Sequence, residues 1–210
     1  GIFKHAPYAS RLRVTKVVST LWFVSVLIEY QGVTVSQYVL VHGAWHGGWC
    51  WSRVQPLLRA AGHGVYAVTL TGAGERAHLL SKDIRLDTHI QDVLGLIECE
   101  ELKDVVLVGH SYAGMVITGA ADQLLQQKKE VLRHLVYVDA VTPRSGESWS
   151  SQHSSGVIKE RVEAARKSGG LAIPSPDARV FGVPEPIGSG SSEGKPHTRS
   201  VSTRTPSRSI

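Results

Sequence analysis

The strongest constraint in this sequence is the alternation of short, uncharged apolar runs with amphipathic segments between residues 38 and 138. Four runs have the length and composition of strands buried on both faces: 38–41, 65–70, 105–108 and 135–138. Three segments have apolar residues at helical spacing: 51–61, 87–101 and 112–128. Such alternation predicts an α/β fold, with a mostly parallel sheet and helices on both faces. In these sheets the chemistry lies beyond the carboxyl ends of the strands.

A serine stands where the third of these strands passes into a helix. Residues 108–114 read VGHSYAG, which matches the G-x-S-x-G nucleophile elbow except that Ala113 replaces the last glycine. Small residues at 109 and 113 allow the strand and the helix to approach closely enough for a sharp turn. The turn would hold Ser111 at the positive end of a helix, where an oxyanion is stabilised. Ser111 is therefore interpreted as a nucleophile, and the alternative is a serine that only caps the helix.

A glycine-rich loop, HGAWHGGW at residues 42–49, follows the first strand. Acyl transfer needs backbone N–H donors that point at the developing oxyanion. The predicted donors are Tyr112, the residue after the nucleophile, and Ala44 in this loop. The alternative is a glycine-rich turn with aromatic packing. His42 and His46 have no third ligand nearby in the sequence, so we predict no metal site.

An acidic residue, Asp139, follows the fourth predicted strand. A carboxylate at a strand end orients the catalytic histidine in some hydrolases, which makes Asp139 a candidate catalytic acid. Such an aspartate more often caps the following turn, and both interpretations stay open.

The two ends of the chain differ from its centre in charge. Of the formal charge of +5, residues 1–32 and 187–210 each carry +3, which leaves −1 for residues 33–186. Nucleic-acid binding needs basic residues clustered on folded structure, so we predict no nucleic-acid partner. The apolar run at residues 17–28 is too short to span a bilayer, and we predict no membrane partner. A signal segment, an additional strand of the sheet and a stretch foreign to the domain are its alternative interpretations.

Residues 33–186 resemble the small α/β-hydrolase-fold esterases, a group that includes plant methylesterases and hydroxynitrile lyases. The resemblance is carried by five segments: YVLVHGAWHGGWCW at 38–51, LTGAGERAHLL at 70–80, LDTHIQDV at 86–93, DVVLVGHSYAGMVITG at 104–119 and HLVYVDAVTPRSGES at 134–148. It implies a serine-dependent hydrolase with a small helical cap after residue 143, and neither a metal nor an organic cofactor. It implies the roles of nucleophile for Ser111 and of oxyanion donors for Ala44 and Tyr112.

The sequence departs from this family after the cap. In the family an acid and then a histidine follow further strands, whereas no apolar strand follows residue 186 here. The histidines after Ser111, none of which fits the general base, are His134, His153 and His197. The acid–base half of the triad is therefore missing, and we expect a truncated or frameshifted C-terminus. We also expect the sheet to end at the strand 135–138, with its outer edge bare.

These observations predict three parts: an N-terminal extension at 1–32 foreign to the domain, a hydrolase domain at 33–186 whose cap begins near residue 144, and a disordered Ser/Arg-rich tail at 187–210. The predicted function is hydrolysis of a small-molecule carboxylic ester through an acyl-serine intermediate, in the cytoplasm. One alternative is an inactive fragment or binding protein with a formed pocket. Another is a carbon–carbon lyase of the hydroxynitrile lyase type. The oligomeric state stays open.

Overall fold

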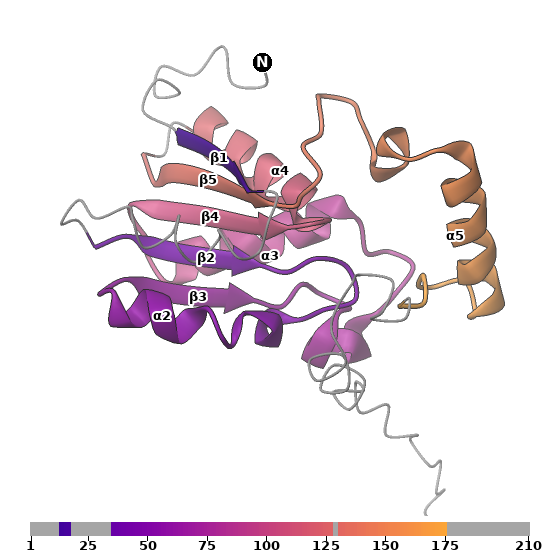
Figure 1. Cartoon of the computed structure of the whole chain (residues 1–210), viewed down its shortest axis with the longest axis horizontal. Helices are drawn as coiled ribbons and strands as arrows, with labels where there is room; N and C mark the ends of the chain where they lie inside the picture. Colours follow the sequence, from indigo (N-terminus) through magenta and orange to yellow (C-terminus); the bar gives the residue numbers. More distant parts are fainter. Residues whose placement is uncertain (1–12, 18–34, 128–129, 176–210) are drawn as a thin grey trace, which may run out of the picture. The chain divides into compact units, whose positions relative to one another are not determined.

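The computed structural model describes residues 13–17, 35–127 and 130–175. By its internal contacts the chain divides into two units, Gly1–Pro174 and Ser175–Ile210. The helices and strands of the described residues all lie in the first unit (Figure 1). In chain order they are β1 (Arg13–Val17), β2 (Gln37–Val41), η1 (Gly48–Trp51), α2 (Gln55–Ala60), β3 (Gly64–Val68), η2 (Gly74–Leu79), α3 (Leu86–Cys99), β4 (Val105–His110), α4 (Ala113–Gln126), β5 (Leu132–Val138), η3 (Trp149–Gln152) and α5 (Ser155–Lys167).

Five strands form one parallel sheet in the order β1-β5-β4-β2-β3, which confirms the predicted α/β fold. Val41 of β2 pairs with Gly109 of β4 on one side and with Val68 of β3 on the other. The chain therefore crosses the sheet from β2 to β3 and returns past β2 to reach β4. This reversal places the carboxyl ends of β2 and β4 side by side, where open α/β sheets bind ligands.

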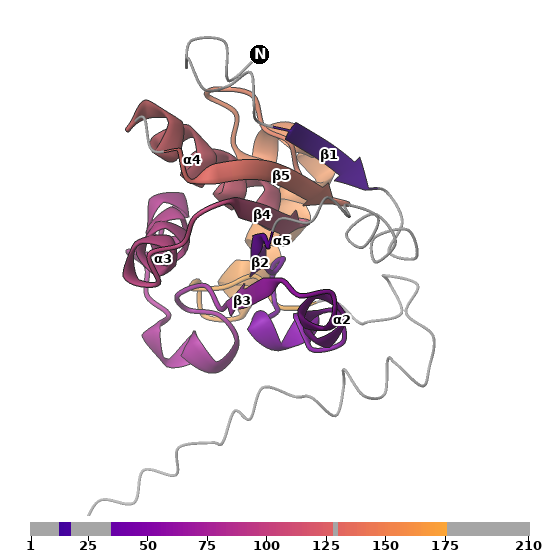
Figure 2. The same ribbon diagram turned by 90° about the vertical axis from the view of Figure 1, so that its left-hand side faces the viewer.

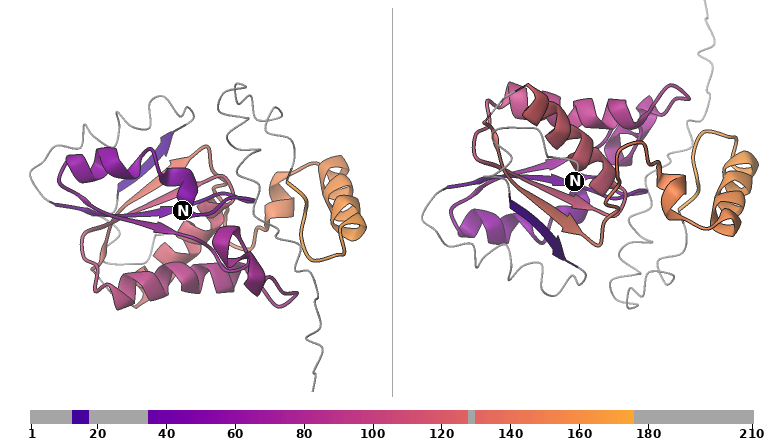
Figure 3. Two further views of the ribbon diagram at one scale, coloured as in Figure 1. Left: turned by 90° about the horizontal axis from the view of Figure 1, so that it is seen from below. Right: turned by 90° about the horizontal axis from the view of Figure 1, so that it is seen from above.

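Helices cover both faces of the sheet, as Figures 2 and 3 show. Side chains alternate along β2: Val39 and Val41 pack with α3 and α4, whereas Tyr38 and Leu40 pack with η1 and α2. All four of these strand side chains are buried. The central strands are thus held by a separate apolar core on each face, and both cores fix the loops at the strand ends.

One edge of the sheet differs from the expectation. β1 pairs in parallel with β5, from Arg13 opposite His134 to Val17 opposite Val138. The Thr15 hydroxyl is hydrogen-bonded to His134 Nε2 at 2.8 Å. The prediction of a bare outer edge is therefore wrong, because five residues from the predicted N-terminal extension pair with that edge. The rest of the apolar run at 17–28 and the predicted tail at 187–210 lie outside the described residues.

The element boundaries also differ from those predicted. The predicted helix 51–61 is the 3₁₀ helix η1 followed by α2, because Pro56 lacks an N–H and favours the first turn of a helix. α3 and α4 lie within or close to the predicted segments 87–101 and 112–128. β3 ends at Val68 rather than at residue 70, so Thr69 and Leu70 bond to the loop after β2 instead.

The chain continues from β5 into η3 and α5, where the resemblance implies a helical cap. α5 begins after Ser154, whose hydroxyl accepts a hydrogen bond from the Val157 N–H at 3.5 Å. None of its side chains is buried. No helix in the described ranges is both long enough and apolar enough to cross a membrane.

Replacing a helical glycine by alanine is expected to have opposite effects on stability at Gly114 and at Gly95. A Cβ at Gly114 of α4 would overlap the Val141 carbonyl oxygen and lie 2.9 Å from its carbonyl carbon, whereas a Cβ at Gly95 of α3 meets no atom within 4 Å. We expect Gly114→Ala to lower the free energy of unfolding by about 1–3 kcal/mol through overpacking. We expect Gly95→Ala to raise it by up to about 1 kcal/mol. Urea unfolding of both variants measures this difference, and equal losses in the two would contradict it.

Candidate active site

Ser111 lies on a tight turn between β4 and α4, as predicted. Its φ of +52° is in the left-handed region, where a residue with a side chain is strained by roughly 1–3 kcal/mol. Hydrogen bonds hold the turn: the Ser111 N–H donates to Val138 O at 3.2 Å, and Ser111 O accepts from Gly114 N at 3.1 Å and from Val141 N at 3.0 Å. Strain of this kind persists at functional sites when the surroundings over-determine it. The geometry is that of a nucleophile elbow.

Small residues at the base of the turn permit the close approach of strand and helix. A Cβ on Gly109 would lie 2.8 Å from the Ala113 carbonyl oxygen and 3.0 Å from Ile117 Cδ1. These distances are too short for any side chain at residue 109. The structure therefore confirms why a small residue was expected at position 109, and the same expectation for Ala113 stays a prediction.

The glycine-rich loop after β2 lies against Ser111. A Cβ on Gly43 would be 3.1 Å from Ser111 Cβ and 2.8 Å from His110 Nδ1, so the loop backbone reaches the elbow because residue 43 has no side chain. Neither the Ala44 N–H nor the Tyr112 N–H has a hydrogen-bond acceptor in the described part of the chain. Within the described ranges both predicted donors are thus available to an oxyanion, and their role in an oxyanion hole stays a prediction.

His42 connects this loop to the end of β3. The Leu70 N–H donates to His42 Nε2 at 3.0 Å, so Nε2 is unprotonated and Nδ1 donates to Gly43 O at 2.7 Å. Burial lowers the pKa of His42 to about 4, which keeps the ring neutral. Both ring nitrogens are used in holding Gly43 next to Ser111. Within the described ranges no three His, Cys, Asp or Glu side chains come together as a metal site.

A second connection joins the same loop to the segment after β3. The Gly48 N–H donates to Thr69 Oγ1 at 2.7 Å, and that hydroxyl donates to Glu75 Oε1 at 2.5 Å. The Thr69 hydroxyl also holds the pKa of Glu75 below its usual value. Sequence reasoning did not assign a role to Thr69 or Glu75. The signal available was a polar residue directly after a buried strand, in a segment that carried the family resemblance.

Tyr112 is fixed by its side chain as well as by the turn. His89 of α3 lies with Nε2 3.0 Å from Thr71 O and with Nδ1 2.9 Å from the Tyr112 hydroxyl. Because a carbonyl oxygen only accepts, Nε2 carries the proton and Nδ1 accepts from the tyrosine. Burial raises the pKa of Tyr112 to about 12, so its hydroxyl remains a donor. The residue that supplies a predicted oxyanion donor is thereby attached to α3.

The structure does not join Asp139 to a histidine. Asp139 is exposed at the carboxyl end of β5, and no hydrogen bond links it to a histidine within the described ranges. Its charge acts on His110, whose pKa is nevertheless lowered, mainly by burial. Its role as catalytic acid stays a prediction.

The histidines that follow Ser111 in the sequence have partners other than Ser111 where the structure describes them. His134 is in the first half of β5, at the other end of the sheet, and His153 bonds to Trp149 O at 2.9 Å and stacks on the Trp149 ring. His197 lies outside the described residues. Among the described histidines, none is hydrogen-bonded to the Ser111 side chain. Within the described ranges, therefore, no histidine is bonded to the predicted nucleophile as a general base.

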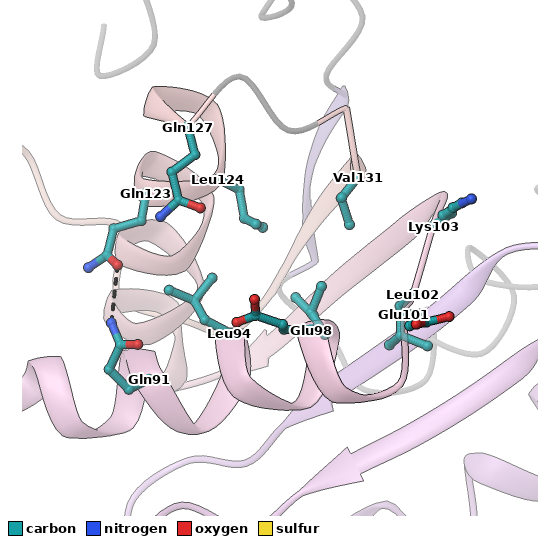
Figure 4. Close-up of a pocket in the computed structure, with 11 residues that line it drawn as sticks. Gln91, Leu94, Glu98, Glu101, Leu102, Lys103, Gln123, Leu124, Gln127 and Val131 are labelled. Carbon is teal, nitrogen blue, oxygen red and sulfur yellow. Dashed lines mark hydrogen bonds between the residues drawn. The ribbon is translucent and has the colours of Figure 1, made fainter.

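A groove of about 460 Å³ lies elsewhere, between the ends of α3 and α4 (Figure 4). Its floor includes Leu94 and Leu124, and the side-chain amide of Gln91 donates to Gln123 across it at 3.2 Å. Lys103, which also lines it, precedes β4, whereas Ser111 follows β4. The groove is therefore at the amino-terminal edge of the sheet, opposite the elbow.

Comparison with known proteins supports the same interpretation. The model of the alpha/beta hydrolase family matches residues 38–203. A carbendazim hydrolyzing esterase of Nocardioides sp. (strain SG-4G) is 56% identical over 114 residues, 54% of this chain and 46% of the relative. Methylesterase 2 of Arabidopsis thaliana is 33% identical over 130 residues, 61% of this chain and 46% of that protein.

The solved structures agree on the fold. An extracellular alpha/beta-hydrolase from a Paenibacillus species superposes with a TM-score of 0.66 at 24% identity, and covers 75% of this chain and 64% of that one. The chain spans about half the length of the curated relatives it matches. The family model covers well over half of the chain, and it includes both the elbow and the loop that faces it. This chain belongs to the alpha/beta hydrolase family.

Proposed function

We propose that the protein hydrolyses a small-molecule carboxylic ester through an acyl-serine intermediate. The observation that carries the proposal is the strained Ser111 against the loop backbone at Gly43, with N–H groups at Ala44 and Tyr112 that have no acceptor within the described ranges. Ser111 Oγ forms a bond to the ester carbonyl carbon while the two N–H groups stabilise the oxyanion. The bond to the alcohol then breaks, and the alcohol takes up the proton that Ser111 lost. Water cleaves the acyl-serine and restores the hydroxyl.

The relatives support this substrate class. One of them is named as an esterase and another as a methylesterase. Within the described ranges no charged group is hydrogen-bonded to the Ser111 side chain, and the predicted oxyanion donors are backbone N–H groups. Such a site is consistent with an uncharged substrate such as a small ester. A location in the cytoplasm remains a prediction.

A second candidate is binding of an ester without turnover. It is favoured by one observation, that the histidines of the described ranges leave the Ser111 side chain without a bonded general base. A serine without its base acylates and deacylates slowly, because proton transfer contributes about 10²–10⁴-fold to such steps.

Rapid mixing with p-nitrophenyl acetate separates the two candidates. For an esterase we expect a burst of p-nitrophenol close to one equivalent, followed by steady turnover, and an acetyl group on the peptide that contains Ser111. A burst without turnover would support acylation and show that deacylation is blocked. Binding of the ester with neither p-nitrophenol release nor acetylation of Ser111 would overturn the hydrolase proposal.

A further inference from the structure

The loop that carries Ala44 has a direct link to the cap. Trp45, the next residue, has a φ of +65°, and its side chain is 36% exposed. Its indole N–H donates to Ile173 O at 2.7 Å. The Arg161 guanidinium of α5 lies 5.4 Å from the centre of the Trp45 ring, within the range of a cation–π interaction. One side chain of the loop therefore meets both α5 and the segment that follows it.

Within the described ranges the cap has few other contacts that attach it. α5 is 13 residues long and buries no side chain. A helix of this length is marginally stable alone, so its stability depends on the contacts that hold it against the domain. The contacts that Trp45 makes with Ile173 and Arg161 are thus a substantial part of what keeps α5 in place.

The same contacts act on the loop. A bulky residue in the left-handed region is strained by roughly 1–3 kcal/mol and keeps that conformation only where its surroundings hold it. His46 Nδ1 bonds to Ala44 O at 2.7 Å within the loop, and the contacts of Trp45 with the cap hold the turn from outside. The position of the Ala44 N–H therefore depends on whether the cap is docked.

We propose that Trp45 is a positioning residue that couples docking of the cap to the orientation of the Ala44 oxyanion donor. This rests on the proposed function for its catalytic consequence, but the coupling itself is a property of the folded chain. When the cap is docked, Trp45 holds the turn and the donor faces Ser111. When the cap leaves, the turn relaxes and the donor is lost. Because such coupling is reciprocal, loosening either side loosens the other.

The test is hydrogen–deuterium exchange of the full chain, which needs no turnover. Trp45→Phe keeps a ring for Arg161 but removes the donor to Ile173, and Arg161→Gln removes the cation. A hydrogen bond contributes about 0.5–1.5 kcal/mol, so we expect amide exchange to rise about 3- to 10-fold in α5 and in residues 42–49 of Trp45→Phe. An exposed cation–π contact contributes about 0.5–1 kcal/mol, so exchange of the same two segments should rise about 2- to 5-fold in Arg161→Gln. Trp49→Phe is the matched control: Trp49 is 51% exposed and its ring faces His46, so only the loop should change.

A kinetic measurement tests the catalytic consequence of the coupling. An oxyanion donor acts on charge that develops in the transition state, so Trp45→Phe should lower the rate constant of Ser111 acylation without changing the half-saturating ester concentration. Unchanged exchange in α5 of Trp45→Phe, or unchanged exchange of the loop in Arg161→Gln, would overturn the coupling. Failure of Ser111 to acylate in the unmodified chain would overturn the proposed function instead, and the exchange result would still decide the coupling.

Discussion

Replacing Ser111 by alanine is expected to abolish the burst of p-nitrophenol from p-nitrophenyl acetate, together with acetylation of the peptide that contains residue 111. The variant keeps the donors of Ala44 and Tyr112 but has no oxygen to form the acyl intermediate. Its fold should persist, because the hydrogen bonds of the turn are made by the backbone of Ser111 and a smaller side chain removes none of them. The measurement is the initial rate of p-nitrophenol release together with the thermal melting temperature.

A matched control is Ser52→Ala, which changes an exposed serine at the end of η1. This variant should hydrolyse the ester at the rate of the unmodified chain. If Ser111→Ala instead retained the full rate while melting normally, the activity would come from another group and the role of Ser111 as nucleophile would be wrong.

Acidification is expected to destabilise the protein through His42. The pKa of this histidine is about 4 in the folded chain, against a value of 6.5 when exposed. The unfolded chain therefore takes up a proton below pH 6.5, while folded His42 stays neutral until about pH 4. Its contribution to stability is fully present above pH 6.5 and is lost as the pH falls toward 4. The loss amounts to about 3 kcal/mol, since one unit of pKa corresponds to about 1.4 kcal/mol.

Urea unfolding of the unmodified chain and of His42→Gln, at intervals from pH 7.5 to 4.5, isolates this effect. His63, His110 and His134 also have lowered pKa values, mainly through burial, so the unmodified chain should weaken on acidification through several groups. The variant should start less stable, because it loses the bonds to Gly43 and Leu70, and its stability should fall less steeply with pH. Parallel curves for the two proteins would show that His42 does not titrate as described.

The features that the sequence predicted are those encoded by local patterns. Uncharged apolar runs such as Val105–Val108 are stable only when buried, so their place in the interior could be predicted. The small residues around Ser111 indicate a sharp turn in any fold that contains this strand and helix. The approach of the loop at 42–49 to Ser111 was also predictable, because parallel strands carry their loops at one edge of the sheet.

The features that the sequence did not reveal depend on distant partners. β1 has the sequence RVTKV, and its side chains at Arg13, Val14 and Lys16 are exposed. It therefore lacks the apolar pattern by which a buried strand is predicted, whereas the adjacent apolar run at 17–28 has such a pattern. The role of His42 depends on Leu70, 28 positions later. The hydrogen bond of Trp45 likewise depends on a distant partner, Ile173, which is 128 positions away in the sequence.

The pairing of β1 with β5 has a consequence for how the chain folds during synthesis. Arg13 lies opposite His134, so of the described strands the first to leave the ribosome is joined to the last. At 5–20 residues per second, roughly 6 to 24 seconds separate the synthesis of β1 from that of its partner. During this interval β2, β3 and β4 have emerged and can pair with one another, while β1 must wait. Addition of β1 is therefore expected to be the last event in the assembly of the described strands, and a nascent chain halted before residue 132 would leave β1 without β5.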